Sequence, residues 1–309
     1  MNPSSRSHGS IAVSLFLAVG LWGASNAGTK FILQSWPPVW TGGTRFLCAG
    51  LLMLAILRWT SWLGPREMVR DDLRRLLWRR SALSLAVYIV AFNWAVRLTS
   101  VSHVALYLGA SPVWALLWEG KTSGSWREMA RRYGAAALAL SGVVVLFWPT
   151  LAQGHGHWVG EALGLGCSVL WTQFGRQCRS LGTELSGATV TAQTMWRAGV
   201  LLMPVGVVEC LGRDLPLAPA LLAVQAYCVL GGGIAAFALW NSALRCWRTS
   251  EVYLFNNLIP VSTMLWAHFC LGEAITRTFG AAMALVVLGV VLGQTRWEWL
   301  LAGRRAVGE

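Results

Sequence analysis

The stretch NWAVRLTSVSHVALYLGASPVWALLWE, residues 93–119, contains two apolar runs that are separated only by LTSVS at 98–102. With the apolar residues that precede it, the stretch would make one helix of roughly 40 residues, whereas about 20 residues are enough to cross a bilayer. The stretch therefore predicts two membrane-spanning helices that are joined by a tight turn.

A second copy of this pattern begins 148 residues later, at 241–267, as NSALRCWRTSEVYLFNNLIPVSTMLWA. The identities that align at this offset include Asn93 with Asn241, Arg97 with Arg245, Val104 with Val252, Leu106 with Leu254, Pro112 with Pro260, and Trp118 with Trp266. Apolar helices can resemble one another by chance, but chance rarely preserves a proline and an arginine in one register. We interpret the two copies as an internal repeat.

Apolar runs of this kind cover most of the chain, which is 55% hydrophobic and only 12% charged. Soluble globular proteins are about 25% charged. Two soluble domains would fit the length of 309 residues but not these runs. The sequence predicts an all-α integral membrane protein with ten transmembrane helices, at residues 11–33, 38–58, 82–99, 101–119, 131–149, 160–180, 187–210, 218–245, 250–270 and 277–295.

The predicted helices divide into two repeats of five, at residues 11–149 and 160–295. Because five crossings are an odd number, the second repeat must be inverted relative to the first. Inverted repeats let one packing scheme build an inward and an outward gate around a site near the bilayer midplane. Helices five and ten are almost wholly aliphatic and small, so we expect them outside that site. The G-x-x-x-G spacing of Gly289 and Gly293 would pack against another helix or in a homodimer.

The formal net charge of +12 does not indicate nucleic-acid binding, because the basic residues are concentrated on one side of the predicted membrane. The positive-inside rule then places both termini in the cytoplasm, and we expect a bacterial inner membrane protein. The seven scattered cysteines form no C-x-x-C pair and are interpreted as small apolar helix residues. The sequence predicts no metal site and no cofactor.

Four segments resemble a known transporter family: GLWGASNAGTKF (20–31), RFLCAGLLML (45–54), TSVSHVALYLGASPVWALLWE (99–119) and CLGE (270–273). In their order, spacing and duplication, the chain is similar to the drug/metabolite transporter superfamily, within it to the ten-helix branch of two EamA-type repeats. That family usually has Gly-Glu after the fourth and ninth helices, but the first copy here reads WEGK at 118–121. The resemblance implies a secondary carrier, typically an exporter of amino acids or other small metabolites. Aromatic amino-acid exporters are similar in length and layout.

Polar and aromatic residues inside the predicted helices mark a candidate substrate cavity. Trp22, Asn26 and Thr29 share one helix face, and an amide in hydrocarbon is costly unless it faces protein or a wet cavity. The candidate substrate-binding residues are Trp22, Asn26, Tyr88, Phe92, His103, Tyr107, Ser111, Trp171, Trp240, Asn256 and Asn257. Such a lining suits a zwitterion with an aromatic or apolar side chain, while helix–helix packing is the alternative for each residue.

The charged residues of the predicted helices leave alternatives open. Lys30 either extends to the membrane interface or attracts a substrate carboxylate at the outer mouth, and Arg197 is either a cavity cation or an interface residue. All 13 acidic residues fall in loops or near helix ends, whereas proton- and sodium-coupled carriers commonly keep a carboxylate near the midplane. We therefore expect export by alternating access without a coupling ion.

Other function classes compete with this interpretation. One is a proton-coupled drug or metabolite exporter of broad specificity, and another is a channel, which would favour a continuous polar pore over an aromatic pocket. An intramembrane enzyme would need a nucleophile with a base, or paired carboxylates, but the sequence has no G-x-S-x-G or H-E-x-x-H motif. The predicted partners are a small-molecule substrate and the lipid bilayer, not nucleic acid.

Overall fold

The computed structural model describes residues 8–64, 67–111, 114, 118, 126–152, 158–181, 184–244, 255 and 258–294. Within these ranges all regular structure is helical, and each of the ten predicted runs contains a helix. The first half has α1 (His8–Ile32), α2 (Pro38–Trp59), the continuous α3 (Asp71–Leu76), η2 (Leu77–Ala82) and α4 (Leu83–Leu98), then α5 (Val101–Gly109) and α7 (Trp126–Ala152). The second half has α8 (Trp158–Leu181), α9 (Gly187–Cys210), the continuous α10 (Pro219–Tyr227), η3 (Cys228–Ala235) and α11 (Ala236–Leu244), then α13 (Ile259–Leu271) and α14 (Arg277–Gln294).

Five of the described helices are long and apolar enough to cross a membrane by length and composition alone: Ser10–Ile32, Pro38–Trp59, Asp71–Leu98, Met129–Leu146 and Pro219–Trp240. The third helix begins at Asp71, well before the predicted start at 82. Its charged first turns are helical because Leu73 and Leu77 pack against Leu181 and Leu185. A search for apolar runs could not find this amphipathic extension.

The tight turn predicted at LTSVS is present. Helix α4 ends at Leu98 and α5 begins at Val101. The hydroxyl of Ser100 caps α5 by accepting a hydrogen bond of 3.2 Å from the backbone nitrogen of Ser102, which satisfies one of the free donors of the first turn. The prediction of two separate helices in this stretch is confirmed.

The packing of α2 on α9 is reciprocal between the two halves. A Cβ atom on Gly50 would lie 2.2 Å from the backbone nitrogen of Trp196, and a Cβ atom on Gly199 would lie 2.5 Å from that of Leu47. Residues 47 and 50 correspond to 196 and 199 at an offset of 149, so each half presents the same two positions to the other. Reciprocal contacts of this kind are what a two-fold relation produces.

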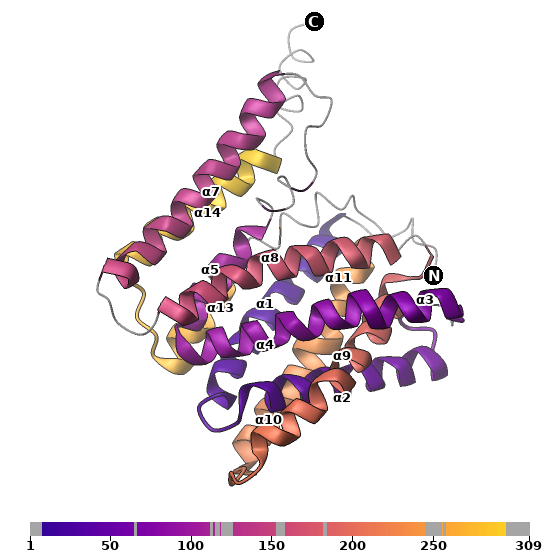
Figure 1. Ribbon diagram of the computed structural model, residues 1–309. Coiled ribbons are helices and arrows are strands. Elements are labelled where there is room, and N and C mark those ends of the chain that lie inside the picture. Colours follow the sequence, from indigo (N-terminus) through magenta and orange to yellow (C-terminus); the bar gives the residue numbers. More distant parts are fainter. Residues whose placement is uncertain are drawn as a thin grey trace, which may run out of the picture.

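Helices α7 and α14 repeat this reciprocity and lie side by side (Figure 1). A Cβ atom on Gly142 would lie 2.7 Å from the carbonyl oxygen of Ala282, and one on Gly289 would lie 2.7 Å from that of Ala135. The offset of 147 relates both pairs. Gly289 therefore packs against a helix of the same chain, as predicted, while the surroundings of Gly293 lie outside the described part. Three predictions remain untested: the homodimer, the repeat boundaries and the inverted relation of the repeats. The reciprocal glycine contacts are consistent with the inverted relation.

Helix connections that are distant in the sequence meet at one end of the bundle, here called the distal end. The indole of Trp36 donates to the carbonyl oxygen of Pro216 over 2.8 Å, and the carboxylate of Glu209 accepts from the backbone nitrogen of Val39 over 2.8 Å. The carboxylate of Glu273 likewise accepts from Ser100. Since α1 ends and α14 begins at the distal end, α1 begins and α14 ends at the opposite one.

Candidate functional site

A central cavity is formed by residues of α1, α2, α4, α5, α8, η3, α11 and α13, which come from both halves of the chain. Its empty volume is about 920 Å³, part of which is continuous with the solvent. Helices α7 and α14 contribute no described residue to its lining.

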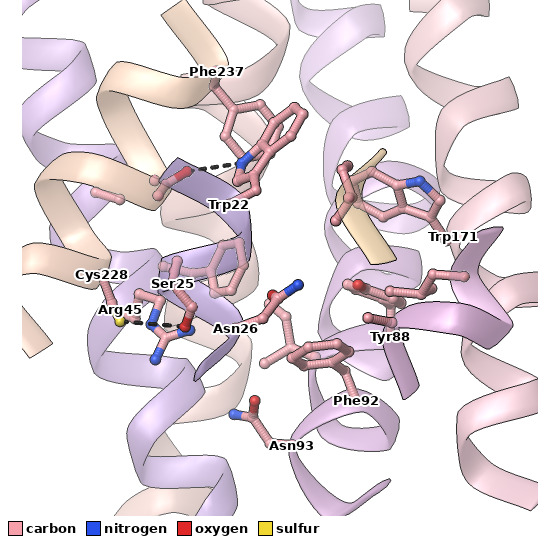
Figure 2. Close-up of a pocket in the computed structure, with 18 of the residues that line it drawn as sticks. Trp22, Ser25, Asn26, Arg45, Tyr88, Phe92, Asn93, Trp171, Cys228 and Phe237 are labelled. Atoms are coloured by element: carbon pink, nitrogen blue, oxygen red, sulfur yellow. Dashed lines mark hydrogen bonds between the residues drawn. The ribbon is translucent and has the colours of Figure 1, made fainter. Parts of the chain in front are cut away.

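One wall of the cavity is aromatic. Tyr88 and Phe92 of α4 and Trp171 of α8 lie on the same side of the cavity (Figure 2). The ring centroids of Tyr88 and Trp171 are 5.1 Å apart, and those of Tyr88 and Phe92 are 5.7 Å apart. Phe174 supports Trp171 from behind, with centroids 5.5 Å apart. Packed rings of this kind present a fixed apolar surface, with separations that favour ring–ring contact.

The opposite wall comes from α1, α2, η3 and α11, and it combines the rings of Trp22 and Phe237 with the polar groups of Ser25, Asn26 and Arg45. The indole of Trp22 donates to the carbonyl oxygen of Gly232 over 3.0 Å, and its ring contacts Phe237 edge-on. The amide nitrogen of Asn26 donates to the hydroxyl of Thr263 over 3.0 Å. These bonds hold Trp22 and Asn26 in place, and both residues line the cavity.

The structure brings five of the predicted residues together around this cavity: Trp22, Asn26, Tyr88, Phe92 and Trp171. It places four others away from the lining: His103, Tyr107, Ser111 and Trp240. Asn256 and Asn257 lie outside the described residues. Substrate binding by any of these residues stays a prediction.

Trp240 lies outside the lining because it is packed into a separate apolar cluster. Only 7% of its surface is exposed, and it lies with Ile11 and Leu15 at the start of α1. Its ring is 5.2 Å from that of Trp22, so it supports a cavity residue from behind. The repeat aligns Trp240 with Phe92, but Phe92 lines the cavity and Trp240 does not.

His103 and Tyr107 lie outside the lining because this face of α5 is turned toward α8. There they surround Glu161, whose side chain is only 2% exposed. Nδ1 of His103 is 2.8 Å from Oε1 of Glu161, and the hydroxyl of Tyr107 donates to Oε2 over 2.6 Å. The hydroxyl of Thr99 also donates to Oε1. We call these four residues the Glu161 cluster.

Ser111 is turned away from the cavity by the same contact between α5 and α8. Its hydroxyl donates to the carbonyl oxygen of Leu108 over 2.6 Å and to that of Ser168 over 3.3 Å. The hydroxyl of Thr172 donates a hydrogen bond of 3.1 Å to the carbonyl oxygen of Ser111. These bonds join the chain around Ser111 to α8, which is the helix-packing alternative for this residue.

Lys30 is tied to the backbone at the distal end. Its Nζ donates to the carbonyl oxygens of Val96 and Thr99, both over 2.6 Å. The C-terminal carbonyls of a helix favour a cation. The structure thus shows Lys30 as a link between α1 and the end of α4, and it does not line the cavity.

Among the lining residues to which the sequence analysis gave no role, Arg45 of α2 is the charged one, and it is 7% exposed. Its Nη1 donates to the hydroxyl of Thr29 over 2.7 Å. The signal was present, since a lone arginine within the apolar run RFLCAGLLML suggests a functional residue by default. Arg197, the other arginine left open, instead stacks on Trp196 with its guanidinium carbon 4.4 Å from the ring centroid, and it is outside the lining.

The comparison with protein families finds a match over most of the chain. The model of the EamA-like transporter family matches twice, at residues 9–148 and 158–293. One solved structure, described as the crystal structure of a protein, aligns with a TM-score of 0.63 and 18% identity. The alignment covers 97% of this chain and 99% of that one, and it shows a likeness of fold.

Several curated relatives align over nearly their whole length. The uncharacterized inner membrane transporter YedA of Escherichia coli (strain K12) is 27% identical over 286 residues, which cover 90% of this chain and 89% of that protein. An S-adenosylmethionine/S-adenosylhomocysteine transporter of Chlamydia trachomatis serovar L2 is 24% identical, with coverages of 89% and 86%. A protein of Escherichia coli (strain K12) named as a probable amino-acid metabolite efflux pump is 23% identical, with coverages of 95% and 97%.

Proposed function

This chain belongs to the EamA-like transporter family, and we propose that it exports amino acids with aromatic or apolar side chains, or related small metabolites, through the central cavity. The arrangement of the cavity carries this proposal: an aromatic wall faces, across the cavity, a wall that includes the amide of Asn26 and the guanidinium of Arg45. An amino acid has the same division into an apolar part and a polar part.

The relatives support a substrate that contains an amino-acid group. One of them is named for amino-acid metabolite efflux and another for S-adenosylmethionine and S-adenosylhomocysteine, both of which contain an α-amino carboxylate. The rings of Tyr88, Phe92 and Trp171 would then accept the side chain of the substrate, while the amide of Asn26 would face its polar end.

The test is counterflow in liposomes that contain the purified chain, with L-tryptophan, L-phenylalanine, L-leucine and L-glutamate. We expect saturable exchange that is faster for tryptophan, phenylalanine and leucine than for glutamate. Trp171→Ala should reduce this exchange strongly. Trp148→Ala is the matched control, because Trp148 of α7 is 66% exposed and far from the lining. Equal flux of all four amino acids, or an equal loss in both variants, would contradict the proposal.

Transport by alternating access would use residues 11–149 and 160–295 as two inverted units. The reciprocal contacts of α2 with α9 and of α7 with α14 support this arrangement, because inverted repeats can form the same gate on either side of a central site. A structure of the opposite state should superpose its first half on the present second half about an axis in the membrane plane. Superposition about the membrane normal would exclude the inverted repeat.

Export without a coupling ion is the mode that the cavity favours. No described lining residue is an aspartate or a glutamate, and a bound zwitterion carries no net charge across the potential. A potential worth about 2.3 kcal/mol per charge per 100 mV should therefore hardly bias transport. Flux that follows the substrate gradient alone, at any pH gradient, is the expected result.

Proton-coupled export is the second candidate, and the Glu161 cluster is the observation that favours it. A buried carboxylate next to a histidine can exchange a proton, although it lies beside the cavity and not in its lining. If a pH gradient alone accumulates substrate, and if Glu161→Gln or His103→Ala removes that accumulation, the coupled mode replaces the uncoupled one.

The location proposed for the chain is the bacterial inner membrane with both termini in the cytoplasm. The charge distribution and the inner membrane relative support it. Fusion of alkaline phosphatase, which is active only outside the cytoplasm, to residue 309 should give no activity, whereas fusion after residue 214 should give activity. The reverse pattern would invert the topology.

A further inference from the structure

The guanidinium of Arg45 is a buried cation whose hydrogen bonds are incomplete. Its side chain is 7% exposed and belongs to the cavity lining. Nη1 donates to the hydroxyl of Thr29 over 2.7 Å, while Nη2 is 3.5 Å from Oε1 of Gln225. Nε is buried and has no partner. Of its five N–H groups, only one therefore makes a short bond to a described residue.

No acidic residue of the described part lies within ion-pair distance of Arg45. Glu209 contacts the start of the same helix, α2, where it accepts from the backbone nitrogens of Val39 and Trp40. A buried charge without a counter-charge is costly, so the site gains free energy when an anion enters. A cation held in this way is prepared for a ligand and contributes little to the fold.

The neighbours of Arg45 hold it in one position. Gln225 donates through its amide nitrogen to the carbonyl oxygen of Thr41 and to the hydroxyl of Thr44, both over 3.0 Å. Thr29 in turn donates to the carbonyl oxygen of Ser25 over 2.7 Å. Fixed neighbours reduce the ordering cost of binding, and the planar guanidinium matches the two oxygens of a carboxylate.

The position of Arg45 relative to the two walls suggests the form of the ligand. It lies on the side of Ser25 and Cys228, across the cavity from Tyr88 and Trp171, with Asn26 between them (Figure 2). We propose that Arg45 binds the carboxylate of the transported substrate, whose apolar part rests on the aromatic wall. The inference rests on the proposed function, because it assigns the substrate's charged group to one residue of the same cavity.

Three indole compounds test the proposal on the purified full-length chain. L-Tryptophan has a carboxylate and an ammonium group, indole-3-propionate has only the carboxylate, and tryptamine has only the ammonium group. A ligand that binds the folded state raises the unfolding temperature. The first two compounds should raise it at lower concentration than tryptamine. Equal responses to all three, including no response, would overturn the proposal.

The variant Arg45→Gln should remove the carboxylate preference, with a loss of affinity of about tenfold for the two carboxylates, which is typical for a charged hydrogen bond. Arg197→Gln is the matched control, since Arg197 is equally buried but lies outside the lining, and it should keep the preference. If Arg45→Gln does not give a monodisperse protein, Arg45→Lys is used in its place. The preference for carboxylates over tryptamine should then be weaker than in the unaltered chain but still present. If the Arg45 variant keeps the carboxylate preference of the unaltered chain, Arg45 does not bind the carboxylate.

Two further experiments distinguish a failure of the Arg45 site from a failure of the proposed export function. A titration with sodium chloride that reproduces the stabilisation, and that Arg45→Gln abolishes, would assign Arg45 to a resident chloride and overturn the substrate role. An Arg45-dependent carboxylate preference without any flux in liposomes would keep the site and remove the proposed export. Tryptophan flux that Arg45→Gln leaves intact would keep the export and remove the site.

Discussion

The chain buries two charges in opposite ways, at Glu161 of α8 and at Arg45 of α2. Glu161 accepts hydrogen bonds from Thr99 and Tyr107 and contacts His103. Arg45 has one short bond, one long contact and a buried Nε without a partner. Both side chains are more than 90% buried. They differ in how many of their hydrogen bonds are made. A buried charge with complete hydrogen bonds holds helices together, whereas one with incomplete hydrogen bonds can bind a ligand.

The different roles of Glu161 and Arg45 follow from the free-energy cost of burying polar groups. A buried charge is tolerated when hydrogen bonds and opposite charges surround it, and removal of one partner then leaves the others unpaired. An unsatisfied charge contributes little to the fold, and its removal has little to disrupt. The two sites should therefore respond in opposite ways to substitution, in stability and in transport.

The largest loss of stability is expected for Glu161→Ala. It leaves His103, Tyr107 and Thr99 without their common acceptor, and the loss of one partner in a buried charged network costs about 3 kcal/mol or more. The unfolding temperature of the purified protein in detergent measures it. Glu184→Ala is the control, because that glutamate is exposed and its contact with Arg70 at 3.6 Å is worth about 0.5 kcal/mol or less. Equal shifts of the unfolding temperature in both variants would show that the Glu161 cluster adds no more stability than an exposed ion pair.

Removal of one tyrosine hydroxyl from each region, the Glu161 cluster and the cavity wall, tests the same difference with a smaller change. Tyr107→Phe deletes the 2.6 Å bond to Glu161 without loss of ring volume, so unfolding should become easier by about 2 kcal/mol. Tyr88→Phe makes the same change in the cavity wall, where no described residue bonds the hydroxyl. It should leave the unfolding temperature nearly unchanged and alter the KM of transport. A stability loss in Tyr88→Phe as large as in Tyr107→Phe contradicts this reading.

A smaller effect is expected for Lys30→Met at the distal end. The change removes two bonds to backbone carbonyls, and a loss of about 1 kcal/mol is typical for partly exposed bonds. Binding of indole-3-propionate and tryptamine should be as in the unaltered chain, because Lys30 does not line the cavity. If the carboxylate preference disappears instead, the substrate carboxylate belongs to Lys30 and not to Arg45.

The smallest change in stability is expected for Arg45→Met. Replacement of a poorly satisfied buried charge by an apolar side chain of similar volume is often neutral or slightly stabilising, within about 1 kcal/mol. The same variant should lose most carboxylate flux in liposomes. An unfolding temperature that falls as far as in Glu161→Ala would make Arg45 a structural residue.

Much of the fold was accessible from the sequence because hydropathy and helical periodicity are local properties. They predicted the ten helices, the turn at 98–102 and the small-residue packing of Gly289. The early start of the third helix was missed, since Leu73 and Leu77 pack against Leu181 and Leu185 of the second half of the chain. A helix whose apolar face depends on a distant partner does not stand out in a hydropathy profile.

The candidate site divides in the same way. Trp22, Asn26, Tyr88, Phe92 and Trp171 were found because each polar or aromatic residue in an apolar helix needs a reason to be there, and all five line the cavity. His103 and Tyr107 passed the same criterion. Their helix is rotated toward Glu161, 54 or more residues away along the chain. Rotation of a helix about its own axis is set by its neighbours, which a single-helix pattern does not contain.

Hydropathy thus predicted a membrane protein of ten helices, and helical periodicity marked the residues that need protein or a cavity around them. Which of the buried charges are satisfied depends on contacts between segments that are distant in the sequence. Arg45 and Gln225 are 180 residues apart, and Lys30 and Thr99 are 69 apart. The physical reason is that a charge inside a membrane protein is stabilised by whichever groups the packing brings within about 3 Å, and that distance depends on helices that the local sequence does not describe.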